Sequence, residues 1–403
     1  MPARPAHPPD PHEPTNPGRT HHAHPLLRCP RTRTPAPPLV PLVRAAATAG
    51  HDVAVLTSGG MRDALAAELP GVPVLAAGPM PPELFAEVAR RLPGSDPANR
   101  PEPAAVAEFF AGTRVDLTVD DAVREARTWG PDVVVADAVD LVGPLVAATL
   151  GVPYAVVAFG PEVPDAFRRP MTELVLPPVR GPGPGAVTPR WRCSTRRRRP
   201  CRRPGGRSTP LTVPFRAEPH SRPGDTTPLP PFPASERPRV LVTLGTVFGD
   251  AALLTAIIDG LHPDEADVLA TVGVIGDHLE DTDHVHHVPF RPMRELLDGV
   301  DVVVSAAGAG TVLAAASVGV PMVLLPQGAD QFINAERAAA ADVAVVVDEP
   351  AAVGPAVHAV LAGSRHAAAA RRLREENEQR PSAGDAIAVL VDRVTRATSA
   401  AER

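Results

Sequence analysis

Short runs of β-branched and aliphatic residues alternate with longer helix-like runs in two parts of the chain, residues 50–160 and 239–379. A short continuous apolar run is typical of a strand buried on both faces of a parallel sheet. Strands that alternate with helices in this way indicate an α/β fold. We therefore predict strands at residues 51–56, 72–76, 132–137, 151–159, 239–244, 268–274, 285–288, 302–304, 321–325 and 343–347, and helices at 38–50, 119–128, 143–150, 251–261 and 366–379.

The stretch from Asp301 to Asn334 carries the pattern with the clearest chemistry. The strand at 302–304 runs into small residues, Ser305 to Thr311, and then into an alanine-rich helix. Because the strand at 321–325 follows this helix, the two strands must lie parallel with a right-handed crossover. Several amides at the first turn of such a helix point outward together, and this arrangement attracts anions.

A second polar loop follows the strand at 321–325 and contains Asp330 and Gln331. In open parallel sheets a ligand lies beyond the carboxyl ends of the strands, where this loop and the glycine-containing loop converge. Asp330 and Gln331 stand just before a helix. They either cap that helix or accept hydrogen bonds from hydroxyls of a ligand whose phosphate lies on the first loop.

The string FRPMRELLDGVDVVVSAAGAGTVLAAASVGVPMVLLPQGADQFINAERAAAA, residues 290–341, resembles the donor-binding half of two-domain nucleotide-sugar glycosyltransferases. It is most similar to bacterial enzymes of the UDP-glycosyltransferase family that glycosylate macrolides and other natural products. The family's aromatic-x-Pro-x loop, its HGGAGT-like pyrophosphate loop and its DQ pair occur in register. The counterparts are Phe290, Pro292 and Met293, then residues 306–311, then Asp330 and Gln331.

Three positions depart from the family pattern. Ala306 replaces the histidine of the pyrophosphate loop, Ala307 replaces the following glycine, and Arg291 stands where a small apolar residue is usual. The backbone anion site survives these changes, but an imidazole contact to the phosphates is lost.

The resemblance implies two facing Rossmann-like domains (the GT-B fold), with the acceptor bound by the first and the donor by the second. It implies an inverting transfer of a hexose or deoxyhexose from a TDP- or UDP-sugar to a hydroxyl of a hydrophobic natural product such as a macrolide. No metal and no cofactor beyond the nucleotide-sugar co-substrate are implied. The implied donor-binding residues are Thr246, Phe290, Met293, Gly308, Ala309, Gly310, Thr311, Asp330 and Gln331.

Asp137 is the one catalytic candidate and falls where the family keeps the aspartate that orients its base histidine. A carboxylate at the end of a strand suits that role, since it fixes the imidazole tautomer and stabilises its charge. The alternative is a loop aspartate that caps the next helix. The base itself is not identified: the corresponding residues are 34–37, and the spacing of His21, His22 and His24 does not make any of them its replacement.

Two segments interrupt the pattern. Residues 1–40 contain 12 prolines, residues 180–207 contain 10 arginines, and Cys29, Cys193 and Cys201 all lie in these segments without the spacing of a zinc site. We predict a disordered or aberrant segment at 1–37 in which the first strand is missing, an acceptor domain at 38–179, a linker at 180–213 and a donor domain at 214–403. The linker is a basic insert for an anionic surface, a solvated connection, or a stretch translated out of frame.

The composition of the whole chain narrows the function further. No apolar run reaches the roughly 18–20 residues needed to span a bilayer, and no secretory signal precedes the domains, so we expect a cytoplasmic protein. A net charge of −6 argues against a nucleic-acid binder. An auxiliary protein or a homodimer is a further partner to consider. The rival functions are a nucleotide-sugar-binding or auxiliary protein that has lost turnover, and an epimerase on the same fold.

Overall fold

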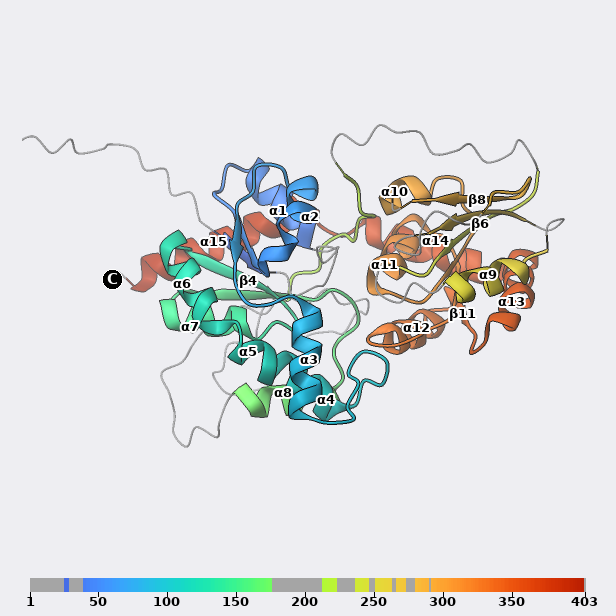
Figure 1. Ribbon diagram of the computed structural model, residues 1–403. Coiled ribbons are helices and arrows are strands. Elements are labelled where there is room, and N and C mark those ends of the chain that lie inside the picture. The colour runs from blue at the N-terminus through green and yellow to red at the C-terminus, as the bar shows by residue number, and fades with distance from the viewer. Residues whose placement is uncertain are drawn as a thin grey trace, which may run out of the picture.

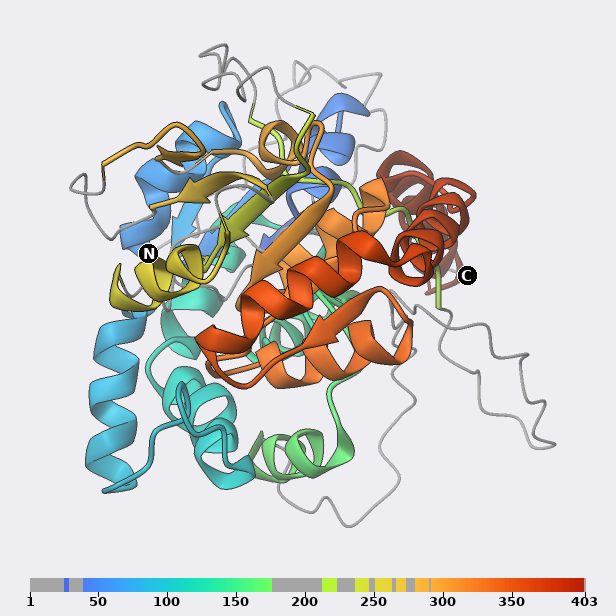
Figure 2. The same ribbon diagram turned by 90° about the vertical axis from the view of Figure 1, so that its right-hand side faces the viewer.

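The computed structural model describes residues 25–28, 39–175, 212–222, 236–245, 251–262, 266–272, 280–289 and 291–401, with side chains described for all of these except 25–28, 397, 398, 400 and 401. Two α/β units lie side by side (Figure 1), an N-terminal domain coloured blue to green and a C-terminal domain coloured yellow to red. The C-terminal domain faces the viewer in Figure 2.

The N-terminal sheet has five described strands in the order β3-β2-β1-β4-β5, all parallel. Their bounds are β1 (Pro25–Arg28), β2 (Ala54–Thr57), β3 (Val74–Ala76), β4 (Val133–Asp137) and β5 (Tyr154–Val157). The prediction that the first strand is missing is therefore wrong. Strand β1 is only four residues long, but its backbone pairs with β2 on one side and β4 on the other, and such pairing does not depend on a long apolar run.

Helices cover both faces of this sheet. On one face α6 and α7 contribute Ala122, Ala126, Val142 and Val146, and on the other α1 and α2 contribute Leu39, Val43 and Leu65. The described helices are α1 (Leu39–Thr48), α2 (Arg62–Glu68), α3 (Pro81–Arg91), α4 (Pro103–Ala107), the π-helix Glu108–Thr113, α5 (Arg114–Asp116), α6 (Val119–Trp129), α7 (Val142–Leu150) and α8 (Asp165–Val175).

The C-terminal sheet has six described strands in the order β11-β10-β9-β6-β7-β8, again all parallel. They are β6 (Arg239–Thr243), β7 (Asp267–Thr271), β8 (Val285–Val288), β9 (Val302–Ser305), β10 (Met322–Leu324) and β11 (Ala344–Val346). The helices are α9 (Ala251–Asp259), α10 (Met293–Leu296), α11 (Ala309–Val318), α12 (Gln331–Ala340), α13 (Val353–Ala362) and α14 (Ser364–Glu378).

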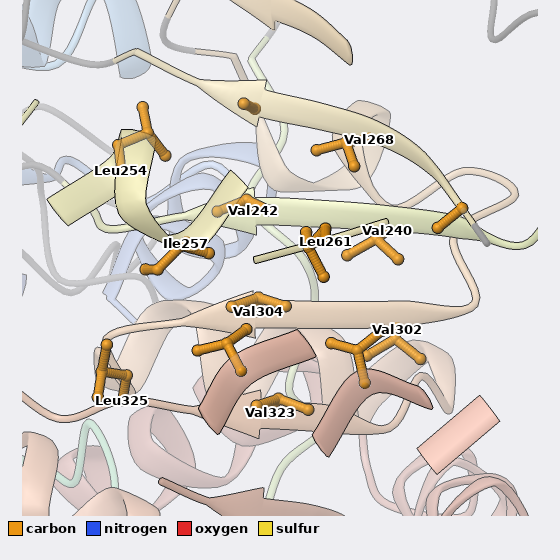
Figure 3. Packing of buried hydrophobic residues seen from close by; sticks show 14 of the residues in the cluster. Val240, Val242, Leu254, Ile257, Leu261, Val268, Val302, Val304, Val323 and Leu325 are labelled. Atoms are coloured by element: carbon orange, nitrogen blue, oxygen red, sulfur yellow. The ribbon is translucent and has the colours of Figure 1, made fainter. Parts of the chain in front are cut away.

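Alternate residues of these strands enter different cores. Val242 and Val304 pack with Leu254 and Ile257 of α9 (Figure 3), whereas Val303 packs on the opposite face with α11, α12 and α14. This alternation is what a strand buried on both faces requires. It also decides in which core each residue of the following loop lies.

The last helix, α15 (Ala383–Ala401), returns to the N-terminal domain and lies beside α1 (Figure 1). Its residues Ile387, Leu390 and Val394 are buried in the same core as Leu39 and Val43. The helix predicted at 366–379 corresponds to α14, which packs on α11 within the C-terminal domain. Helix α15 can pack on the N-terminal domain because its apolar residues recur at helical spacing along one side, whereas α14 is mostly polar.

The returning chain runs against the segment 212–222, which also joins the two domains. The side-chain amide of Asn377 donates to Ala217 O at 2.8 Å and accepts from Ala217 N at 2.9 Å. Segment 212–222 is anchored on the N-terminal domain by Glu68. The Glu68 carboxylate accepts hydrogen bonds from His220 Nε2 at 2.6 Å and from Arg222 Nη2 at 2.6 Å. Burial acts to raise the pKa of Glu68, but these two partners outweigh it and lower the pKa.

In the part of the chain that the structure describes, no helix is both long and apolar enough to cross a bilayer.

Replacing Asn377 with alanine tests the pairing of the two crossings. The substitution leaves a backbone N–H and a C=O of Ala217 without their partner, so we expect a loss of about 2–3 kcal/mol in the free energy of unfolding, measured by urea titration. Gln379→Ala is the matched control, because Gln379 is exposed at the end of the same helix and should change stability by less than about 0.5 kcal/mol. Equal effects of the two substitutions would contradict the role of Asn377.

Candidate functional site

The turn between β9 and α11 has the geometry of an anion site. The N-cap residue, Gly308, has φ −60° and ψ 137° and provides no side-chain hydrogen bond to the first turn of α11. A Cβ added at Gly308 would meet no atom within 4 Å, so the space in front of the turn is open. The first-turn amides, which include those of Ala309 and Gly310, can therefore receive a negatively charged group together with the helix dipole.

The residues before this turn explain its shape. Ala307 has φ 62°, a left-handed conformation that is strained for alanine and easy for the glycine of the related motif. Its N–H donates to Ser305 Oγ at 3.3 Å. Ala306 is 2 % exposed and lies in the apolar core with Val304 and Val323, so its Cβ does not point toward the open space. Diphosphate binding at this turn would therefore depend on backbone amides.

The loop between β10 and α12 is braced from within. Gln331 is buried, and its Oε1 accepts from Gln327 N at 2.7 Å and from Gly328 N at 3.0 Å. Asp330 occupies the N-cap position of α12 but makes no side-chain cap hydrogen bond. The structure thus does not show helix capping by Asp330, and it gives Gln331 a role in shaping the loop.

Asn334 joins the two loops and was missed by the sequence analysis. It is 2 % exposed, and its Nδ2 donates to Ala307 O at 3.0 Å and to Asp330 Oδ2 at 2.9 Å. One side chain therefore links the glycine-containing turn to the acidic residue of the second loop. The available signal was spacing, because Asn334 follows Asp330 by four residues and so lies on the same face of α12.

Asp137 is the last residue of β4 and is 1 % exposed. Its Oδ1 accepts from Val139 N at 3.0 Å, whereas Asp140 accepts from Gly143 N at 3.2 Å at the start of α7. The cap of the next helix is thus supplied by Asp140. Arg28, the last residue of β1, pairs with Ala136, so β1 ends beside Asp137. Residues 29–38 and His21, His22 and His24 lie outside the described residues.

Loops of the N-terminal domain meet the turn between β9 and α11 directly. Val139, which follows β4, and Phe159, which follows β5, pack against Ala309 of α11, and Phe110 of the π-helix joins this cluster. A Cβ added at Gly160 would lie 3.3 Å from Asn334 Oδ1 and 3.6 Å from Ala309 Cβ. The carboxyl ends of the two sheets therefore face each other, with an apolar wall on the N-terminal side.

The remaining predicted residues fall in three groups. Gly308, Ala309, Gly310 and Thr311 form the turn and the first residues of α11, with Gly310 and Thr311 partly exposed. Met293 begins α10 and is half-buried against the C-terminal core. Thr246 and Phe290 lie outside the described residues. Among the described residues, no group of three histidine, cysteine, aspartate or glutamate side chains is placed to hold a metal ion.

The burial of Ala306 gives a direct test of the turn. Ala306→His should destabilise the protein by about 1–3 kcal/mol, because the imidazole must enter a packed apolar core. Thermal unfolding with and without TDP measures this. Ala340→His is the matched control, since Ala340 is exposed at the end of α12 and its replacement changes only helix propensity, by less than about 0.7 kcal/mol. A more stable Ala306→His variant with tighter TDP binding would show that the side chain reaches the open space after all.

Comparison with known proteins places the chain in a family. Models of the erythromycin biosynthesis protein CIII-like family match twice, the N-terminal domain at residues 44–204 and the C-terminal domain at residues 266–392. The L-demethylnoviosyl transferase of Streptomyces niveus is 30 % identical over 357 residues, 86 % of this chain and 91 % of that protein. The elloramycin glycosyltransferase ElmGT of Streptomyces olivaceus is 30 % identical over 385 residues, 88 % of this chain and 93 % of that protein.

A solved structure agrees with the fold. The Streptomyces sp. SF2575 glycosyltransferase SsfS6, complexed with thymidine diphosphate, is 25 % identical, with a TM-score of 0.72 over 92 % of this chain and 100 % of that chain. The predicted fold of two facing Rossmann-like domains is confirmed. At this identity and coverage, the chain belongs to the erythromycin biosynthesis protein CIII-like family of glycosyltransferases.

Proposed function

We propose that the protein transfers a hexose or deoxyhexose from a TDP- or UDP-sugar to a hydroxyl of a hydrophobic natural product such as a macrolide, with inversion at the sugar carbon. The observation that carries this proposal is the open start of α11, linked by Asn334 to Asp330 of the second loop. The similarity to an L-demethylnoviosyl transferase and to the elloramycin glycosyltransferase, together with the thymidine diphosphate bound in the solved neighbour, supports the choice of donor and acceptor classes.

The donor would lie on the C-terminal domain. Its diphosphate would receive hydrogen bonds from the first-turn amides of α11, as phosphates do at helix N-termini. Asp330 would accept hydrogen bonds from sugar hydroxyls, while Gln331 keeps the Gln327 and Gly328 amides in place. The family resemblance places Thr246 against the phosphates, and it places the loop of Phe290 and Met293 against the nucleobase. It assigns no metal or further cofactor.

The acceptor would lie on the N-terminal domain beside the apolar wall of Phe110, Val139 and Phe159, in which Phe110 is partly exposed and the other two are buried against Ala309. This wall packs on Ala309, so an acceptor bound there would lie close to the donor diphosphate. Burial of an apolar aglycone on aromatic and aliphatic side chains supplies binding energy, and such a surface places few constraints on the shape of the aglycone.

The chemistry would be one in-line displacement. A histidine base takes the proton of the acceptor hydroxyl, the oxygen attacks the sugar carbon, and the bond to the diphosphate breaks with its charge held by the α11 amides. Asp137 would orient that histidine and stabilise its positive charge. The position of Asp137 beside the end of β1 supports this assignment, because the related enzymes carry the base in the loop after that strand.

A second candidate is a nucleotide-sugar-binding protein that does not turn over. Two observations favour it: Ala306 is buried in apolar core where related enzymes have histidine, and Ala307 is held in a strained left-handed conformation. Neither observation removes the amides that would bind the diphosphate. The two candidates therefore share the donor site and differ in catalysis.

Gly308→Asp tests the donor site. The new carboxylate fits the extended backbone and the open space, where it should cap α11 and raise helix stability by a few tenths of a kcal/mol. It should also weaken TDP binding more than about tenfold, because it occupies the amides and repels the diphosphate. Calorimetry measures the affinity and thermal unfolding measures the stability.

Gly308→Ala is the control for this test, since it adds a Cβ without an acceptor and should change TDP affinity less than about threefold. If the aspartate variant bound TDP as tightly as the alanine variant, the diphosphate would not lie at α11.

Asp137→Asn separates the two candidate functions. It keeps an oxygen for the Val139 amide but removes the charge, so we expect kcat to fall by about 10²- to 10⁴-fold with TDP affinity unchanged. Transfer from TDP-glucose to a panel of macrolide and aromatic aglycones is the assay. Asp140→Asn, at the equally buried neighbour that caps α7, should lower stability and leave kcat within about threefold. Wild-type protein that binds TDP but transfers no sugar would favour the binding-only function.

A further inference from the structure

The loop between α3 and α4 reaches across to the donor domain. The carbonyl of Ala98 accepts a hydrogen bond from Ala329 N at 2.8 Å. The two preceding amides, of Gln327 and Gly328, donate to Gln331 Oε1. Three successive amides of the β10–α12 loop are therefore fixed, two by a side chain of the same loop and the third by the N-terminal domain.

The amide held by Ala98 belongs to a strained residue. Ala329 has φ 51°, a left-handed conformation that non-glycine residues adopt only where the surroundings enforce it. Ala329 directly precedes Asp330, whose carboxylate is bonded to Asn334. The position of the Asp330 side chain at the start of α12 therefore depends on the backbone conformation of Ala329, and so on the hydrogen bond to Ala98.

The Ala98 carbonyl is itself held by a small ordered turn centred on Asp96. Oδ1 of Asp96 accepts from Ala98 N at 3.2 Å and from Asn99 N at 3.0 Å, and Oδ2 accepts from Asn99 Nδ2 at 2.8 Å. Asp96 and Arg100 also form an isolated bridge, with Arg100 N donating to Asp96 O at 2.8 Å. Hydrogen bonds from Asn99 and Ala98 lower the pKa of Asp96, so the turn keeps its charged acceptor over the neutral pH range.

We propose that Asp96 is a positioning residue for the donor sugar: by ordering the turn at residues 96–100 it holds Ala98 against Ala329, and so sets Asp330 in the position where it meets the sugar hydroxyls. The proposal rests on the function proposed above, in which Asp330 contacts the sugar. The effect of Asp96 passes through the backbone of the second loop and reaches the sugar, whereas the diphosphate lies on α11. Replacement of Asp96 should therefore weaken the binding of a sugar nucleotide more than the binding of the nucleoside diphosphate alone.

The test compares Asp96→Ala with Asp96→Asn in the full chain. Asparagine keeps an oxygen that accepts from the Ala98 and Asn99 amides, so it should restore most of what alanine loses. For Asp96→Ala we expect affinity for TDP-glucose to fall about tenfold by calorimetry, and affinity for TDP to change less than about twofold. Asp63→Ala removes an exposed carboxylate of α2 in the same domain and is the matched control, with both affinities unchanged.

A second readout does not depend on any donor. In the ligand-free protein, amide hydrogen exchange in residues 325–331 should be several-fold faster in Asp96→Ala than in the wild type, Asp96→Asn or Asp63→Ala. If exchange in residues 325–331 were the same in Asp96→Ala as in the wild type, the proposal that Asp96 orders the second loop would be overturned. Equal losses of TDP and TDP-glucose affinity would reduce Asp96 to a structural role. If the wild type bound neither ligand, the proposed function would fail, and the exchange measurement alone would decide whether Asp96 orders the second loop.

Discussion

The fold depends on one constraint, the need to cover the apolar face of the N-terminal sheet with a helix from the end of the chain. Ile387, Leu390 and Val394 of α15 are fully buried there, and each such side chain contributes about 1.5–3 kcal/mol. The hydrogen bonds between Asn377 and Ala217 contribute about 1 kcal/mol each. Apolar burial therefore stabilises the crossing, and the polar contacts fix its register. The packing of Val139 and Phe159 on Ala309 then sets the carboxyl ends of the two sheets facing each other.

Within that frame, the donor loops are organised mainly by contacts to backbone groups. Ser305 accepts a hydrogen bond from the Ala307 amide, and Asn334 donates one to the Ala307 carbonyl. Gln331 accepts hydrogen bonds from the Gln327 and Gly328 amides. Buried polar side chains of this kind order a loop only when their hydrogen bonds are made, since an unmet one costs about 1–3 kcal/mol. The site is thus built before a ligand arrives, and amides oriented in advance need no reorganisation when charge develops on a leaving group.

The sequence predicts the regular parts of the structure well. Every strand expected from an apolar run is present within a few residues, and β8 has the predicted bounds, because burial on both faces leaves a continuous apolar signature. Strand β1 was missed because four residues between proline-rich flanks carry no such signature. The return of α15 and the Ala98–Ala329 contact depend on packing between distant segments, which periodicity does not encode. At the site, the turn at Gly308 follows from spacing, but the roles of Asn334 and Gln331 depend on hydrogen bonds to backbone groups that the sequence does not reveal.

The two alanines of the turn tie donor binding to the contact between the domains. Because β9 alternates between two cores, Ala306 and Ala307 enter opposite apolar clusters, and neither offers a polar group to the open space. In the proposed function the diphosphate is held by amides whose direction is set by Ala307. Ala307 is fixed in part by Asn334, which abuts Gly160 of the N-terminal domain. Phe159 packs on Ala309 at the same turn. A loop with an imidazole carries one phosphate contact of its own, whereas here the anion site depends on backbone geometry that both domains maintain. Separation of the domains would therefore weaken donor binding as well as expose the acceptor wall.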